Sequence, residues 1–466
     1  MSSSHLVPDQ PADRAADTAA AAPGPAARGE LRGLTGLRIV AAVWVVLFHF
    51  HFTPLPGVAE VSAVLGPLIA NGALGVDLFF VLSGFVIAYT YLEKLGPRLR
   101  AGATVRFVWA RASRMWPLYA LVFHLFGIWL VARLVLGTDP QIAWQAAQPE
   151  VTPGEWLEQV VMVQLWTSPF LDGASWVGST WSISAEWLAY LLFPVAALGF
   201  FRLRNLPAAL LAIGALLLMA PLAGAYLLLG TPYYPWSWLT RILCGFGAGV
   251  LAFLVVRRLR TTERTLRAAS ALAAALPVAI VAGLLLGEQV GPGRGGLVIG
   301  LFPLLVGALA VADRGPAMIL SHRWAVHGGH LSYALYLVHI PMFEVYWTAL
   351  QAVPALGPDR ALGYVAGVGV VLATLPVAAL GFRLVEEPAR RRMKALLASG
   401  GGGGGGGGRV LREPADPFPS GPRHALSSGR RSTLVSMLIA AQNQRPTAST
   451  RPPDRYRRSA RLHTLT

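Results

Sequence analysis

Arg38 and His49 are the two residues whose types and spacing most clearly suggest chemistry. They are eleven positions apart within one apolar stretch, and eleven steps of a helix return to within about 20° of the same face, about 16 Å further along the axis. A histidine can act as a general base near neutral pH, and an arginine can bind an anionic group. The alternative is that Arg38 only marks orientation in a membrane and His49 lies at its interface.

Two carboxylates are expected beside His49. Asp77 and Glu186 lie near the beginning of two other apolar stretches, and His49 lies near the end of its own, so the three fall in one layer if the helices alternate in direction. A carboxylate would fix the tautomer of the imidazole and stabilise its charged form, so we expect Asp77 or Glu186 to orient His49. No CxxC spacing occurs and no HxxH spacing includes His49, and we expect no metal site.

A second group of charges precedes the sequence Trp116-Pro117-Leu118-Tyr119. Arg111 and Arg114 are three residues apart, so they share one face if this segment is helical. Such a pair suits a phosphorylated ligand that is bound through two hydrogen bonds. The alternative is that both arginines only set the orientation of the chain in a membrane.

Polar residues also interrupt two later apolar stretches. Ser182 and Ser184 precede Glu186, and a second group surrounds Pro341. A proline kink with polar neighbours is typical of a cavity wall, although hydrogen bonds between packed helices explain the same residues. The second group consists of Ser332, Tyr333, Tyr336, His339 and Glu344.

The composition excludes an ordinary water-soluble enzyme. Of 466 residues, 54% are hydrophobic and only 13% are charged, whereas soluble proteins carry about 25% charged residues. A single cysteine, Cys244, excludes an internal disulfide. We therefore predict an all-α polytopic membrane protein, a bundle of about ten transmembrane helices. The expected spans are residues 34–52, 72–92, 115–136, 180–201, 206–229, 236–256, 268–287, 296–313, 328–350 and 361–385.

Lysine and arginine residues predict the topology. They gather in every second connection, as in residues 93–114 and 257–267, while the long connection 137–179 contains acidic residues and neither lysine nor arginine. This alternation predicts an even number of spans with both termini in the cytoplasm. It also explains most of the net charge of +16 without a nucleic-acid partner.

Three regions are predicted along the chain. Residues 1–30 are rich in alanine, proline and aspartate and read as a disordered tail, residues 31–395 as the transmembrane domain, and residues 396–466 as a second disordered tail. The last region contains a run of glycines at residues 400–408 and is basic. It is either a solvated tail or a segment that binds anionic lipid headgroups.

Six of these motifs, in this order, resemble the acyltransferase 3 family. The family hallmark is an arginine, ten residues and a histidine, which matches Arg38 and His49. The other matches are residues 75–85, 111–119, 181–187, 332–339 and 387–388. The resemblance covers residues 31–395. Many bacterial members carry a C-terminal esterase-like domain, and we expect none in residues 399–466, because their composition is of low complexity.

The resemblance implies ten core helices and transfer of an acyl group, usually from acyl-CoA, to a hydroxyl of a carbohydrate or glycosylated molecule. It implies that Arg38 and His49 are catalytic or bind the donor. It also implies sensitivity to change at six further positions, which are Asp77, Ser83, Gly84, Arg111, Arg114 and Glu186. Acyl-CoA, such as acetyl-CoA, would be a co-substrate and no cofactor would stay bound.

Together these points predict a plasma-membrane O-acyltransferase with His49, Asp77 and Glu186 in catalysis. Arg38, Arg111, Arg114, Ser83 and Gly84 are expected to bind the donor. The acceptor is expected to be a cell-envelope carbohydrate or a macrolide-type metabolite. A transporter or flippase would use the same intramembrane charges as a proton relay, but the chain has no convincing internal repeat.

Overall fold

A computed structural model describes residues 30–137, 141–142, 145, 147–357 and 360–399 of the chain. Every element within these ranges is helical, as the apolar stretches predicted. Nine helices in the described part of the chain are long and apolar enough to cross a membrane. The tails expected at residues 1–30 and 396–466 lie almost entirely outside the described residues, although the last helix continues to Ser399.

The long helices follow the ten predicted stretches closely. They are α1 (Arg32–Phe50), α3 (Leu74–Leu95), α4 (Ala101–Val135), α6 (Trp181–Leu203), α7 (Ala208–Leu229), α8 (Ser237–Arg258), α9 (Glu263–Val290), α12 (Arg323–Ala352) and α13 (Ala361–Gly381). The stretch 296–313 divides into the 3₁₀ helix η3 (Arg294–Leu301) and α10 (Phe302–Val311). Shorter elements are α2 (Pro56–Ala70), α5 (Pro153–Val160), η2 (Gly178–Thr180), α11 (Pro316–Leu320), η4 (Pro354–Leu356), the π-helical turn η5 (Phe382–Glu386) and α14 (Glu387–Ser399).

Helix α12 accounts for the difference between ten predicted spans and nine. It is 30 residues long, but the polar side chains around Pro341 make it less apolar than the nine helices that could cross a membrane. Those polar side chains are buried, among them Ser332, His339 and Glu344. Intramembrane polar groups normally face the interior of a bundle, and α12 packs against α1, α4 and α13.

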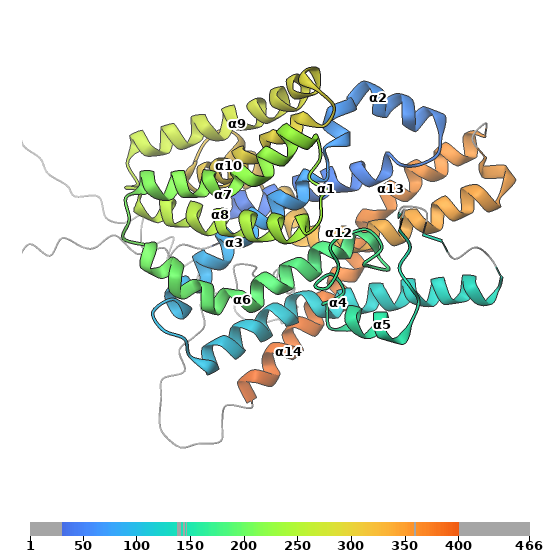
Figure 1. The fold of residues 1–466 in the computed structure, drawn as a ribbon, viewed down its shortest axis with the longest axis horizontal. Helices are drawn as coiled ribbons and strands as arrows, with labels where there is room; N and C mark the ends of the chain where they lie inside the picture. Colours follow the sequence, from blue (N-terminus) through green and yellow to red (C-terminus); the bar gives the residue numbers. More distant parts are fainter. Residues whose placement is uncertain (1–29, 138–140, 143–144, 146, 358–359, 400–466) are drawn as a thin grey trace, which may run out of the picture. The chain divides into compact units, whose positions relative to one another are not determined.

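Helices α1 and α3 lie between two groups of helices. Figure 1 shows α9 and α10 on one side of them and α4, α6 and α14 on the other, while α8 packs directly against α3. Glycines bring α3 and α8 into close contact, because a Cβ atom at Gly84 would lie 2.0 Å from the carbonyl oxygen of Phe246, and one at Gly249 would lie 2.0 Å from that of Val81. Such close backbone contact is typical of packing between membrane helices.

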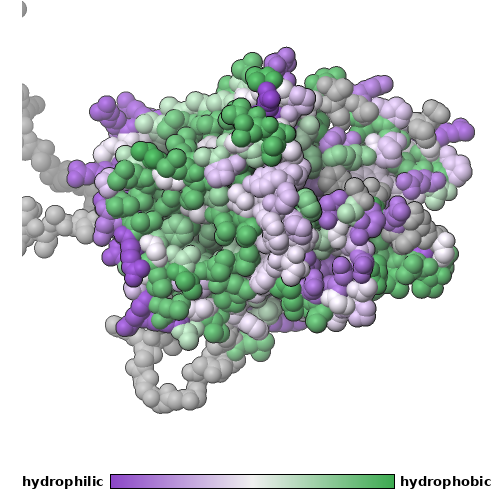
Figure 2. Space-filling view, viewed as in Figure 1, coloured by the Kyte–Doolittle hydropathy of each residue, from purple (hydrophilic) through white to green (hydrophobic). Residues whose placement is uncertain are grey.

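The surface of the described helices matches a lipid environment. Large apolar side chains are exposed along α7, α9 and α13, including Leu217, Leu228, Val278, Leu286 and Val365. Figure 2 shows hydrophobic residues across much of one face, with hydrophilic residues gathered toward its edges. Exposed apolar area of this extent indicates contact with lipid tails rather than water.

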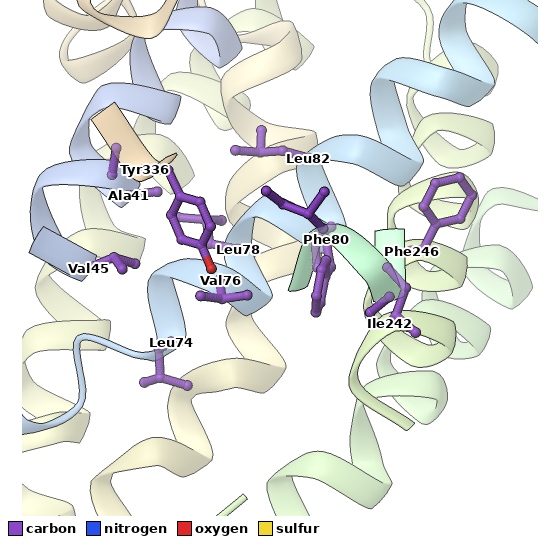
Figure 3. Packing of buried hydrophobic residues seen from close by; sticks show 14 of the residues in the cluster. Ala41, Val45, Leu74, Val76, Leu78, Phe80, Leu82, Ile242, Phe246 and Tyr336 are labelled. Carbon is purple, nitrogen blue, oxygen red and sulfur yellow. The ribbon is translucent and has the colours of Figure 1, made fainter. Parts of the chain in front are cut away.

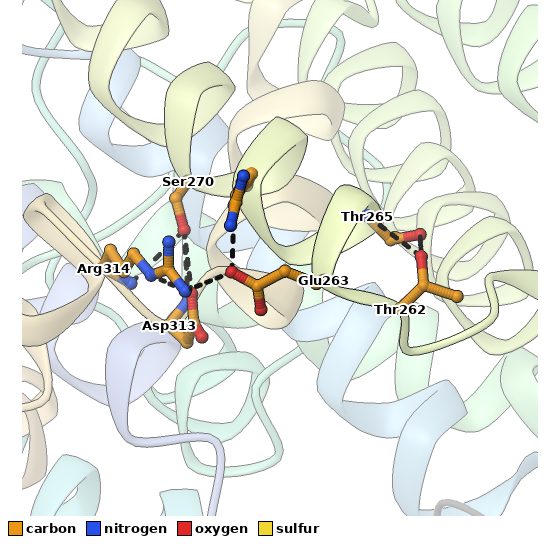
Figure 4. Close-up of polar contacts among 7 residues, drawn as sticks. Thr262, Glu263, Thr265, Ser270, Asp313 and Arg314 are labelled. Carbon is orange, nitrogen blue, oxygen red and sulfur yellow. Dashed lines mark hydrogen bonds and ion pairs between the residues drawn. The ribbon is translucent and has the colours of Figure 1, made fainter. Parts of the chain in front are cut away.

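A polar cluster fixes the beginning of α9 (Figure 4). The side chain of Thr262 caps the helix by accepting a hydrogen bond from the backbone N–H of Thr265. Glu263 pairs with Arg314 at 2.6 Å, and the hydroxyl of Ser270 lies 3.3 Å from a carboxylate oxygen of Asp313. These contacts join the beginning of α9 to the turn after α10.

Candidate active site

His49 lies in the last turn of α1 and is buried, with 7% of its surface exposed. Its Nδ1 lies 2.9 Å from the carbonyl oxygen of Val45 and 3.1 Å from Nε2 of His339 on α12. Because a carbonyl only accepts hydrogen bonds, the proton of the neutral ring belongs on Nδ1. The lone pair of His49 then lies on Nε2, which is the form that a general base needs.

His49 lines a cavity of about 440 Å³, which we call the His49 cavity. Its walls come from α1, α3, α6, α8, α12 and the segment 145–178. Seven of its fifteen lining residues are aromatic, and one is the carboxylate of Asp172. The aromatic lining residues are Phe48, Phe52, Phe170, Trp181, Tyr233, Tyr234 and Tyr336. Flat aromatic faces with few polar groups suit a ring-shaped polar molecule such as a sugar.

Arg38 lines a second, smaller cavity of about 40 Å³, which we call the Arg38 pocket. Its other polar lining residues include Ser182, Glu186 and Ser332, and Arg38 Nε donates a hydrogen bond to Ser332 Oγ at 3.4 Å. The Arg38 pocket and the His49 cavity share two lining residues, Val76 and Tyr336. Arg38 and His49 therefore line neighbouring cavities along one face of α1, as their spacing predicted.

The expected contact between Asp77 and His49 is wrong. Asp77 is fully buried and accepts two hydrogen bonds from Arg241 on α8, from Nε at 2.9 Å and from Nη2 at 2.8 Å. A two-pronged ion pair of this kind satisfies both charges inside the bundle. Sequence reasoning missed Arg241, although an arginine inside the predicted span 236–256 is the signal that a buried carboxylate nearby needs a partner.

Glu186 also lies elsewhere than expected. It lines the Arg38 pocket, not the His49 cavity, because it lies five residues into α6 and so about 8 Å from the start of that helix. Its carboxylate accepts a hydrogen bond from the hydroxyl of Tyr190 at 2.6 Å, and that hydroxyl lies 3.0 Å from Ser83 Oγ. Glu186 and Ser83 are thus joined through Tyr190 across α3 and α6.

The two arginines of α4 are held by different partners. Arg111 donates a hydrogen bond to the hydroxyl of Tyr91 at 3.1 Å and lies over its ring. Arg114 forms an ion pair with the buried Glu386 of η5 and lies over the ring of Tyr333. The carboxylate of Glu386, which sequence reasoning missed, would compete with an anionic ligand for Arg114.

Gly84 lies in the contact between α3 and α8 described above, and neither the His49 cavity nor the Arg38 pocket includes it. The close packing against α8 would make a side chain at Gly84 unfavourable, whether or not a ligand lies nearby. Among the described residues, no group of three or more histidine, cysteine and acidic side chains is arranged to hold a metal ion.

His339 and Tyr336 were predicted to line a cavity wall, without a role for either. In the structure His339 contacts His49, and the centroid of the Tyr336 ring lies 5.7 Å from that of His339. The two residues are three apart on α12, so they share one helix face. That spacing is the sequence signal that places the two side chains together on one wall.

Comparison with known proteins gives a consistent result. A family model described as an acyltransferase domain matches residues 31–382. Over 166 residues, 35% of this chain, the sequence is 28% identical to acyltransferase MdmB of Streptomyces mycarofaciens, and the match covers 38% of that protein. Over 160 residues, 33% of this chain, it is 34% identical to protein 2 in the picA locus of Rhizobium radiobacter, of which 75% is covered. No solved structure matches the chain.

Proposed function

The chain belongs to the acyltransferase 3 family, and from this premise we propose that it is an O-acyltransferase that uses acyl-CoA. The acceptor would be a hydroxyl of a carbohydrate or of a glycosylated molecule. The observation that carries this proposal is the position of His49, buried in the wall of an aromatic cavity of about 440 Å³ with its Nδ1 beside a carbonyl oxygen.

In the proposed reaction His49 acts as the general base. Its Nε2 takes the proton of the acceptor hydroxyl while the hydroxyl oxygen attacks the carbonyl carbon of the thioester. A new C–O bond forms, the C–S bond breaks, and the proton passes from His49 to the sulfur of the departing CoA. His339 would hold the ring in place through its contact with Nδ1, at 3.1 Å.

The donor would reach His49 from the Arg38 end of α1. Arg38 and Arg111 would bind phosphates of CoA, with a smaller contribution from Arg114 because Glu386 already pairs with it. The distance of about 16 Å between Arg38 and His49 along α1 is one that the extended pantetheine arm would span. The alternation of basic residues along the sequence supports a cytoplasmic position for the Arg38 end of α1. Acyl-CoA is made in the cytoplasm.

The acceptor would occupy the His49 cavity. Aromatic rings such as Trp181 and Tyr234 would stack on a sugar ring, and Asp172 would accept hydrogen bonds from its hydroxyls. A cell-envelope carbohydrate and the sugar of a macrolide-type metabolite both have this chemistry. The proposed location is the plasma membrane, supported by the nine apolar helices of the described chain.

One assay tests this function directly. The purified protein in lipid nanodiscs is given acetyl-CoA and a panel of acceptors, namely envelope polysaccharide, simple glycosides and a glycosylated macrolide. Release of free CoA is followed together with the mass of the acceptor. We expect faster CoA release with one acceptor class and a gain of one acetyl mass on it. Absence of both with every acceptor and with longer acyl-CoA donors would favour a transporter.

A further inference from the structure

Tyr336 is the residue at which the two cavities meet. Its side chain lines both the His49 cavity and the Arg38 pocket, as does Val76 opposite. Figure 3 draws both side chains, with the hydroxyl of Tyr336 pointing toward α3. The residue is buried, with 6% of its surface exposed. A molecule that extends from Arg38 to His49 must pass this side chain.

Two hydrogen bonds hold the side chain of Tyr336 between the His49 cavity and the Arg38 pocket. Its hydroxyl lies 2.8 Å from the backbone carbonyl oxygen of Ser179 in η2 and 2.6 Å from the hydroxyl of Ser182 in α6. The hydroxyl of Ser182 lies 3.1 Å from the same carbonyl oxygen, so either hydroxyl can donate to the other while its partner donates to Ser179. These contacts connect α12 to the beginning of α6 and hold the ring between the two cavities.

The space on the Arg38 side of Tyr336 is too small for a substrate in this arrangement. The Arg38 pocket measures about 40 Å³, and a further cavity beyond Arg38 measures about 20 Å³. Neither space has room for an extended pantetheine arm. The His49 cavity is roughly ten times larger. The donor arm therefore needs a movement of Tyr336 before it reaches His49.

We propose that Tyr336 is a divider that decides whether the acyl group goes to the acceptor or to water. This inference rests on the proposed function. Held by Ser179 and Ser182, the ring separates a thioester on the Arg38 side from water in the His49 cavity. When Tyr336 moves aside with the acceptor in place, the acyl carbon meets the acceptor hydroxyl. When it moves aside without acceptor, water attacks instead.

In the side reaction, water hydrolyses the thioester, and the same bonds break and form as in transfer to the acceptor. The water oxygen forms a bond to the acyl carbon, the C–S bond breaks, and one water proton passes through His49 to the CoA sulfur. The products are a free carboxylic acid and CoA. The ratio of free acid to acylated acceptor therefore measures how well the two cavities are kept apart.

Tyr336→Phe tests the divider, because it keeps the ring and removes both hydrogen bonds. We expect the ratio of free acid to acylated acceptor to rise about fivefold, the effect of one weakened hydrogen bond on the closed arrangement. Ser182→Ala, which removes one partner, should raise the ratio in the same direction. Acetyl-CoA is the donor, and the acceptor is the one acylated fastest by the wild-type protein.

Tyr346→Phe is the matched control. Tyr346 lies on the same helix, is also buried and donates a hydrogen bond to the carbonyl oxygen of Gly363 at 2.7 Å, but it lines neither cavity. Its variant should leave the ratio unchanged, even if both variants lose similar thermal stability. An equal ratio in wild type and Tyr336→Phe, with acylated acceptor formed by both, overturns the divider alone. No acylated acceptor from the wild type overturns the proposed function instead.

Discussion

Nδ1 of His49 lies 3.1 Å from Nε2 of His339, across the contact between α1 and α12. The two rings have centroids 4.9 Å apart, and both are buried. A second imidazole and the carbonyl of Val45 thus take the place in which a carboxylate was expected.

Replacement of His339 should lower the rate without loss of substrate binding. His339→Ala removes one of the groups that position the ring of His49 but leaves Val45 in place, so we expect kcat to fall about 10- to 100-fold, less than a general base itself contributes. The KM for acetyl-CoA should stay within about twofold. Steady-state kinetics measure both values. A large rise in KM with unchanged kcat would show that His339 acts in binding and not in positioning.

The ion pair between Asp77 and Arg241 should matter for stability. Asp77→Asn leaves the buried Arg241 without its charged partner, and we expect a loss of about 3–5 kcal/mol. Asp77→Leu combined with Arg241→Met should recover most of this loss, because no buried charge remains. Unfolding in detergent, followed by temperature or denaturant, measures the difference.

The matched control for the ion pair is Glu263→Gln, which breaks the exposed pair with Arg314 and should leave the stability nearly unchanged, because water screens both charges. If Asp77→Asn abolishes acyl transfer while unfolding like the wild type, Asp77 acts in catalysis and the structural role is wrong.

Gly84 should tolerate no side chain, for a reason of packing. A Cβ atom there would lie 2.0 Å from the backbone oxygen of Phe246, so Gly84→Ala forces α3 and α8 apart. We expect a loss of about 1–3 kcal/mol or more. Gly199→Ala on α6 is the control, since no atom lies within 4 Å of the added methyl group, and it should change stability by less than about 1 kcal/mol. Equal unfolding of the two variants would contradict the packing role.

The sequence predicted the helices well because the evidence for each one is local. Length, hydropathy and flanking basic residues lie within one segment, and the structure has helices at all ten predicted stretches. The shared face of Arg38 and His49 is also a property of a single helix, since it follows from the 3.6-residue period. Both cavities along that face agree with the prediction.

Contacts between helices were predicted poorly, because they depend on how each helix is rotated and shifted against its neighbours. Asp77 faces α8 and its Arg241, so it is unavailable to α1. Glu186 lies deeper than the mouth of α6, which places it with Arg38. The sequence does not show which helix a residue faces, and it gives the depth of a residue only as accurately as the predicted end of its span.

Replacement of His49 is the most direct test of the central claim. His51, two residues further on, is the matched control, because it is half-buried and does not line the His49 cavity. Burial lowers the pKa of His51 below its ordinary value, so it is neutral at pH 7.5 and its loss removes no charge. Acyl transfer from acetyl-CoA is measured with both variants at that pH. His49→Ala should be slower by about 10²- to 10⁴-fold while His51→Ala stays near the wild-type rate. Transfer by a folded His49→Ala protein at the wild-type rate would contradict the assignment of the base.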